Sequence, residues 1–339
     1  MDLIVLPSNR PANRFYRGGR QITEFRGEPP AESHEPEDWI ASTTSVFGEP
    51  GVGITTLPNG VPMPTAIERD PQGLLGVEHL AAFGPDTRLL VKLLDAGQRL
   101  PVHAHPDGSF AATHLGHAHG KAEAWYILRG GTVHLGLNRD VEGPGLRNLV
   151  ERQDSESLLS LLNPVDVAPG DVVFVPPCQL HAIGQGVFLL EVQEPEDLSI
   201  LLEWRDFDLD DPAKCHLGLG FDLALNAVSH RHLDQEELDK LFIRAPKAGS
   251  MLPRAADPYF RIERILVDGW QEIAPGFAVL VAVQGDLAAA GEAMPAGRTA
   301  IAPHSMGPIA VSGHGELLVC RPPSPEERAG PRYRTWQFH

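Results

Sequence analysis

The pattern of hydrophobic and polar positions predicts many short strands separated by tight turns. Residues 86–106 (DTRLLVKLLDAGQRLPVHAHP) contain an apolar run, a turn and then an alternation of apolar residues with two histidines, which is typical of strand, turn and strand. Residues 122–130 (AEAWYILRG) and 132–140 (TVHLGLNRD) predict a hairpin. Because turn signals recur about every eight residues through residues 165–195, we expect a β-sandwich or barrel.

Other parts of the chain carry different patterns. Leucines recur at helical spacing in residues 146–163, so we expect two short helices there. Residues 232–246 (HLDQEELDKLFIRAP) predict an exposed helix, and a second β-rich stretch runs from about Tyr259 to Arg321. Its segment MPAGRTAIAPHSMGPIAVSG echoes VAPGDVVFVPPCQLHAIGQG, which favours a duplicated barrel, with chance similarity between two hairpins as the alternative.

Composition and charge exclude several classes of protein. The 339 residues include 28 Lys plus Arg and 45 Asp plus Glu, a net charge of −17, so we expect no nucleic-acid partner. No apolar run approaches the roughly 18 residues that span a bilayer, and the short apolar start before Pro7 lacks the features of a signal peptide. Three cysteines (Cys178, Cys215, Cys320) make no disulfide framework. We therefore expect a cytoplasmic protein that binds no membrane.

Four potential metal ligands occur at spacings that agree with one another. His103 and His105 follow Gly97, Glu123 precedes Gly130, and His181 ends the series Gly170, Pro176, Cys178, His181. Residues two apart in a strand project to one face, so both early histidines can point into a barrel, where Glu123 and His181 would join them. Three imidazoles and a carboxylate suit zinc, iron, manganese or nickel. The alternative is that these are polar residues on an exposed sheet face.

These residues resemble the two cupin motifs, G(x)5HxH(x)nE(x)6G and G(x)5PxG(x)2H, with Cys178 at the second glycine position. The strings LLVKLLDA, VHAHPD, GKAEAWYIL, PGDVVFVPPCQLHAIG and LLEVQEPED further resemble the type I phosphomannose isomerases over most of residues 85–200. The resemblance implies a mainly β fold of tandem cupin-type barrels (jelly rolls) with a small helical insertion. It also implies zinc-dependent aldose–ketose isomerisation, with His103, His105, Glu123 and His181 as metal ligands.

A change of pattern near residue 215 suggests domain limits. We expect a metal-binding cupin domain over residues 1–215, with the helical insertion around residues 144–163. Residues 216–339 would supply a linking helix and a second, degenerate cupin domain, which has Pro308 where a metal-binding His would be expected by count from Pro303. We expect this second barrel to contribute to packing or to an interface.

Two positions depart from the family pattern. His103 stands where the family has Gln, which replaces a weak oxygen ligand by a strong imidazole. Leu201 stands where the resemblance implies an active-site Arg. Arg205 lies four residues further, on the same face of the expected strand and roughly 13 Å away, so it could act only with a different substrate pose.

Two lysines are the candidate proton carriers. Isomerisation moves a proton between C1 and C2, and the chain has only five Lys, of which Lys92 and Lys121 lie near the metal ligands. A desolvated Lys beside a cation can lose its proton, whereas an Arg cannot. The alternative is that these lysines neutralise buried carboxylates. We predict Lys121, Lys92 and Arg205 as catalytic residues.

Two further residues are candidates for substrate binding. Trp125 would line a sugar pocket or else belong to the core. Asp107 would orient a ligand histidine or else cap a turn.

The leading interpretation is an isomerase of a sugar or sugar phosphate, with one divalent metal ion per chain, most simply zinc. The alternatives are a cupin oxygenase or epimerase-like enzyme and a non-catalytic sugar-binding regulator. We expect a monomer or homodimer, and the anionic charge counts modestly against a phosphorylated substrate.

Overall fold

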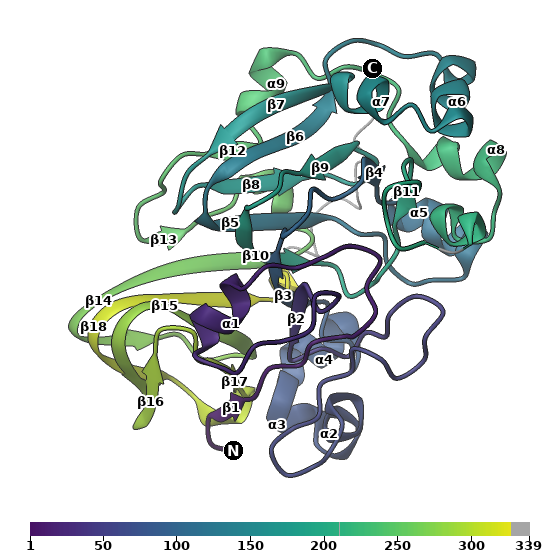
Figure 1. The fold of residues 1–339 in the computed structure, drawn as a ribbon. Coiled ribbons are helices and arrows are strands. Elements are labelled where there is room, and N and C mark those ends of the chain that lie inside the picture. Colours follow the sequence, from purple (N-terminus) through teal and green to yellow (C-terminus); the bar gives the residue numbers. More distant parts are fainter. Residues whose placement is uncertain (210, 327–339) are drawn as a thin grey trace.

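The structure is a computed structural model that describes residues 1–209 and 211–326 (Figure 1). Three antiparallel sheets dominate it, so the mainly β prediction is confirmed. Two of the sheets carry the predicted metal ligands, and the third is built from the long strands of the C-terminal part.

The six-stranded sheet forms one wall of the site. Its strands, in spatial order, are β12 (Phe242–Ile243), β8 (Val172–Val175), β5 (Glu123–Arg129), β10 (Phe188–Gln193), β3 (Leu90–Asp95) and β2 (Glu37–Ile40). All residues of β3 and β10 are buried, because both faces of this sheet pack against other parts of the protein. The charged residues Lys92 and Glu191 therefore lie inside the molecule, directly opposite each other in register.

The five-stranded sheet forms the facing wall. Its order is β11 (Ile200–Leu201), β4 (His103–Ala104), β9 (His181–Ile183), β6 (Gly131–Leu137) and β7 (Leu162–Val167). His103 pairs with His181 on one side and with Leu201 on the other, so three residues of the predicted site share one line across the sheet. The hairpin turn between β5 and β6 requires glycine, since a Cβ on Gly130 would lie 2.3 Å from the Val167 carbonyl oxygen.

The third sheet contains seven strands. Its path is β1 (Ile4–Leu6), β17 (Thr299–Ala302), β15 (Ala278–Ala289), β18 (Ile309–Arg321), β14 (Arg261–Ile273) and β13 (Gly249–Ser250), with β16 (Glu292–Pro295) paired to β15. The N-terminal strand β1 thus completes the sheet built mainly from the C-terminal part, and β12 extends the six-stranded sheet. The domain boundary near residue 215 stays a prediction.

Helices cover the ends of these sheets. Figure 1 shows α6 (Gly143–Arg152) and α7 (Ser155–Ser160) together at one end, between β6 and β7 in the chain, where the leucine spacing indicates helices. The exposed helix expected over residues 232–246 is only α9 (Gln235–Asp239), held by a capping box between Asp234 and Glu237. The rest of the range 232–246 includes the strand β12.

The other helices are short. They are α1 (Gln21–Arg26), α2 (Met63–Arg69), α3 (Pro71–Leu75), α4 (Val77–Phe83), α5 (Gly108–Phe110), the π-helix η1 (Ala111–Leu115), α8 (Phe221–Ala224), and the 3₁₀ turns η2 (Pro212–His216), η3 (Leu225–Ala227), η4 (Arg254–Ala256) and η5 (His304–Met306). None of the helices in the described part of the chain has both the length and the apolar character that crossing a membrane requires.

Candidate metal centre

Three histidines converge between the two walls. His103 and His181 come from the paired strands β4 and β9, and His105 follows β4. Their ring centroids lie 4.0–5.0 Å apart, and one nitrogen of each lies within 4.8 Å of the others. Each Nδ1 lies 2.8 or 2.9 Å from a backbone carbonyl oxygen, which fixes the Nδ1–H tautomer and leaves Nε2 as an acceptor. All three rings thus present an unprotonated nitrogen to one point.

Glu123, the first residue of β5, brings a carboxylate to the same point. Its Oε2 lies 3.0 Å from Nε2 of His105, and its Oε1 lies 3.3 Å from Nε2 of His181. Nε2 of both histidines and Oε2 of Glu123 are buried and have no hydrogen-bond partner. Because acceptors that face one another across such distances repel unless a cation lies between them, the residues present fit a divalent metal.

The surroundings favour the protonation states of His103, His105 and Glu123 that metal binding needs. Burial lowers the pKa of His103 well below its ordinary value, with His181 adding to the shift, and burial and Lys121 lower the pKa of His105 to about 3. Burial alone would raise the pKa of Glu123, but His105 and Lys121 outweigh it and lower that pKa well below its usual range. The His103 and His105 imidazoles are therefore neutral and the Glu123 carboxylate is charged at pH 7.

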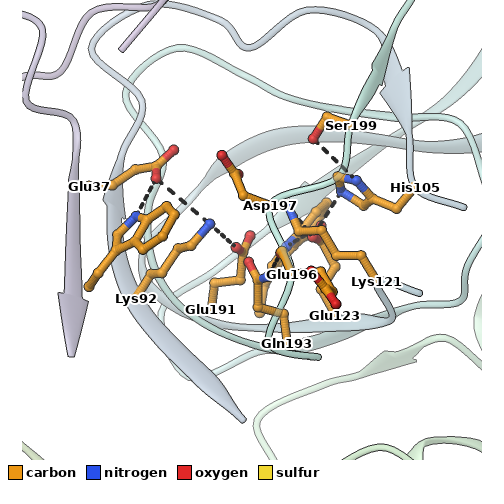
Figure 2. A network of polar contacts seen from close by, with 12 residues as sticks. Glu37, Lys92, His105, Lys121, Glu123, Glu191, Gln193, Glu196, Asp197 and Ser199 are labelled. Carbon is orange, nitrogen blue, oxygen red and sulfur yellow. Dashed lines mark hydrogen bonds and ion pairs between the residues drawn. The ribbon is translucent and has the colours of Figure 1, made fainter. Parts of the chain in front are cut away.

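The two predicted lysines, Lys92 in β3 and Lys121 just before β5, lie in different environments (Figure 2). Lys121 Nζ lies 3.7 Å from Glu123 Oε2, beside the histidine cluster. Lys92 lies further along, with Nζ 3.7 Å from Glu37 Oε2, 3.5 Å from Glu191 Oε1 and 4.6 Å from the centre of the Trp39 ring. Burial would lower the pKa of Lys92, but Glu37 and Glu191 raise it, so this lysine is held protonated. The alternative that Lys92 neutralises buried carboxylates thus has direct support.

Two adjacent cavities lie beside the cluster. The inner cavity, about 30 Å³, is lined by His103, Lys121, Glu123 and Lys92 among others. The outer cavity, about 210 Å³, opens further from the histidines and has Asn13, Phe47 and Lys214 in its wall. Both cavities share a common set of lining residues, namely Arg14, Phe15, Asp197, Ser199 and Leu201. The two cavities are therefore neighbours that meet at one shared wall beside the histidine cluster.

Three residues predicted to take part in catalysis or substrate binding line neither cavity. β11 ends at Leu201, so the expectation that Arg205 continues this strand on the same face is wrong. Arg205 is exposed and donates a hydrogen bond to the Arg152 carbonyl oxygen. Trp125 is fully buried and lines neither cavity, and its Nε1 donates to Glu123 Oε1 at 3.0 Å. Asp107 caps α5 by accepting from the Phe110 backbone N–H, and it also lines neither cavity.

The structure also brings in residues that sequence reasoning missed. Arg14, Tyr16 and Glu37 come from the N-terminal segment and line the inner cavity together with Glu191 and Asp197. The Tyr16 hydroxyl donates to Glu37 Oε1 at 2.5 Å. Burial raises the pKa of Glu191, and the charge of Glu123 adds to the rise. One signal was available for Glu191, which is a charged residue inside the apolar string FLLEVQ, whereas nothing in the sequence marks Arg14.

Cys178, at the second glycine position of the cupin pattern, lies in a turn beside His105. Its backbone N–H donates to the His105 carbonyl oxygen at 2.7 Å, and its φ is 71°, in the left-handed region that favours glycine. The cupin pattern therefore has glycine at this position because the backbone is left-handed there. In this chain Cys178 adopts the same left-handed conformation.

Comparison with known proteins finds relatives that match part of the chain. No family model matches the chain. The chain is 30% identical over 204 residues to a mannose-6-phosphate isomerase of Streptococcus mutans, a match that covers 58% of each protein. It is 36% identical over 126 residues to a mannose-6-phosphate isomerase of Bacillus subtilis, covering 36% of this chain and 38% of that protein. The matched parts thus span between 38% and 58% of these relatives' length.

Solved structures match over nearly the whole chain. The crystal structure of mannose 6-phosphate isomerase from Bacillus subtilis gives a TM-score of 0.75 at 22% identity, covering 95% of this chain and 100% of that one. The chain has the fold of the phosphomannose isomerases. A variant of the phosphomannose isomerase from Salmonella typhimurium gives a TM-score of 0.72 at 16% identity over 96% of this chain. The predicted resemblance and the predicted fold class of tandem cupin barrels are confirmed.

Proposed function

We propose that this protein is a metal-dependent aldose–ketose isomerase that acts on mannose 6-phosphate or a closely related sugar. The observation that carries the proposal is the cluster of His103, His105, His181 and Glu123, whose free acceptor atoms converge beside a cavity that Lys121 also lines. The phosphomannose isomerase fold and the names of the relatives support the same reaction.

The cluster would hold one divalent metal ion, which we propose to be zinc, with iron, manganese or nickel as alternatives. When bound, such an ion acts as a Lewis acid that polarises the oxygen atoms at C1 and C2 of the sugar. His103 is the one histidine of the three that lines the inner cavity, so the open side of the cluster faces the space available to substrate.

Lys121 is the proposed proton carrier. A base must take the proton from C2 of the aldose, which leaves an enediolate, and return it to C1, while a proton moves from the C2 oxygen to the C1 oxygen to give the ketose. Lys121 lies at the cavity wall next to the cluster, where its amine is within reach of a sugar held there. Lys92, held protonated between two carboxylates, is assigned to charge balance and to hydrogen bonding with a substrate oxygen.

We also propose that the enzyme is cytoplasmic and that its binding partner is a small sugar or sugar phosphate. Cys178, Cys215 and Cys320 are all free, as a reducing compartment requires.

The decisive experiment is NMR in D₂O across a panel of free aldoses and their 6-phosphates, with metal content measured on the same sample. We expect ketose formation with deuterium entering at the transferred position, together with about one equivalent of metal. If no aldose in the panel exchanges its C2 proton or yields a ketose while the protein holds stoichiometric metal, the isomerase proposal is wrong.

A further inference from the structure

Arg14 lies in the wall where the two cavities meet. It follows β1 in a segment without regular secondary structure, is only 8% exposed, and is one of the residues shared by the inner and outer cavities. Leu201, which pairs with His103 across β11 and β4, lines the same two cavities. The wall thus has an apolar residue next to the histidine cluster and a buried guanidinium in the same space.

The hydrogen-bonding capacity of Arg14 is only partly used. A guanidinium has five N–H groups, and Arg14 directs two of them to the Asp197 carboxylate at the long distances of 3.3 and 3.4 Å. Its Nε lies 3.6 Å from Glu37 Oε1, beyond hydrogen-bond range, and is buried without a partner. Since buried donors are nearly always satisfied, the free N–H groups point to a ligand that occupies this junction.

The charge of Arg14 is permanent. Burial would lower its pKa, but Asp197 and Glu37 raise it further above its already high value. This residue therefore cannot carry a proton, and it can act only by binding and by its charge.

We propose that Arg14 is a substrate-binding residue whose free N–H groups hold oxygen atoms of the sugar where the cavities join, supplying the cation that Leu201 does not. A planar fork of N–H donors suits paired oxygens, such as vicinal hydroxyls or the two oxygens of an enediolate. The inference rests on the proposed isomerase function. The competing interpretation is that Arg14 only neutralises Asp197 and Glu37.

Three variants of the metal-loaded protein separate these interpretations. Arg14→Met removes the guanidinium, Asp197→Asn removes the charge it pairs with, and the double variant removes both, so that no unpaired Asp197 charge is left behind. We expect Arg14→Met to lower kcat/KM by about tenfold or more, mainly through KM, with metal content unchanged. The double variant should remain about tenfold below Asp197→Asn alone. If the double variant matches Asp197→Asn, Arg14 only balances charge and the inference is overturned.

A rescue variant tests the position itself. Leu201→Arg, combined with Arg14→Met, places a guanidinium on the wall of the same cavities, and we expect it to recover several-fold of the lost kcat/KM. No recovery, with metal content and Tm intact, would count against a cation requirement at this junction.

Binding distinguishes failure of this inference from failure of the proposed function. Saturation-transfer NMR with mannose and with mannose 6-phosphate reports sugar contact whether or not isomerisation occurs. If the unaltered protein binds but does not isomerise, the isomerase proposal fails, while weaker binding to Arg14→Met still supports the role of Arg14. Equal binding to both proteins, or binding to neither, overturns the inference.

Discussion

Replacing Lys92 tests whether this buried lysine mainly stabilises the fold. It is 2% exposed, pairs with Glu37 and Glu191, and lies over the Trp39 ring. Lys92→Met keeps the length and apolar stem of the side chain but leaves two buried carboxylates without their shared cation. Removing one member of a buried ion pair costs about 3–5 kcal/mol.

The size of the effect on Tm follows from chain length. At about 2.1 cal/mol/K per residue, the 339 residues have an unfolding entropy of about 0.7 kcal/mol/K, so a loss of about 4 kcal/mol lowers Tm by about 6 °C. Calorimetry of the metal-loaded protein at pH 7 measures this directly. The matched control is Lys240→Met, because Lys240 also pairs with a carboxylate, Glu236 at 2.7 Å, but both side chains are exposed. We expect that control to shift Tm by less than about 1 °C.

The carboxylates provide a second control. Glu191→Gln in the Lys92→Met background removes one of the unpaired charges and should recover part of the lost stability. If Lys92→Met lowers Tm no more than Lys240→Met, the reasoning from burial and charge pairing is refuted. A kcat/KM that falls at temperatures far below Tm would assign Lys92 a contact with substrate in addition.

The remaining predictions concern metal, proton transfer and acid. His181→Ala should lose most of the bound metal, as measured by elemental analysis. The control His79→Ala, which removes another buried histidine, should keep its metal. Full metal retention by His181→Ala would show that His181 is not a ligand. Lys121→Ala should keep its metal and lose C2 proton exchange by NMR, so wild-type exchange would make Lys121 structural. Burial would raise the pKa of Glu37, but Arg14 and Lys92 lower it from 4.5 to about 2, so Glu37 stabilises the fold above about pH 4.5. That stabilisation should fade as pH falls toward 2, and acid titrations of Glu37→Gln should lack this component.

The fold class and the meeting of three histidines with Glu123 could be predicted from sequence because both depend on local patterns. Alternation and turn signals identify strands, and His103 and His105 project to one face whatever the rest of the chain does. Glu123 and His181 needed only the fixed spacing of the cupin pattern. These four residues lie together in the structure, although their role as ligands stays a proposal.

The rest of the site depends on where strands end and on distant pairing, which local patterns do not encode. Arg205 was placed by extending a strand that stops at Leu201, and a change of backbone direction there sends its side chain to the surface. Trp125 fits the alternation of apolar and polar residues along its strand, but its side chain is fully buried and its Nε1 donates to Glu123. Arg14 and Glu37 reach the cavity from the N-terminal segment, and no periodicity in the sequence connects them with residues 90–200.

The pairing of β1 with β17 has a consequence for the order of assembly. Ile4 lies opposite Ile301, so 301 − 4 = 297 positions separate the two partners along the chain. On the ribosome, β1 therefore emerges long before its neighbour exists, and it stays unpaired until the C-terminal sheet has been made. The segment that follows β1 carries Arg14 and Glu37 to the cavity. Anchoring of the segment that carries Arg14 is in this way linked to synthesis of almost the whole chain.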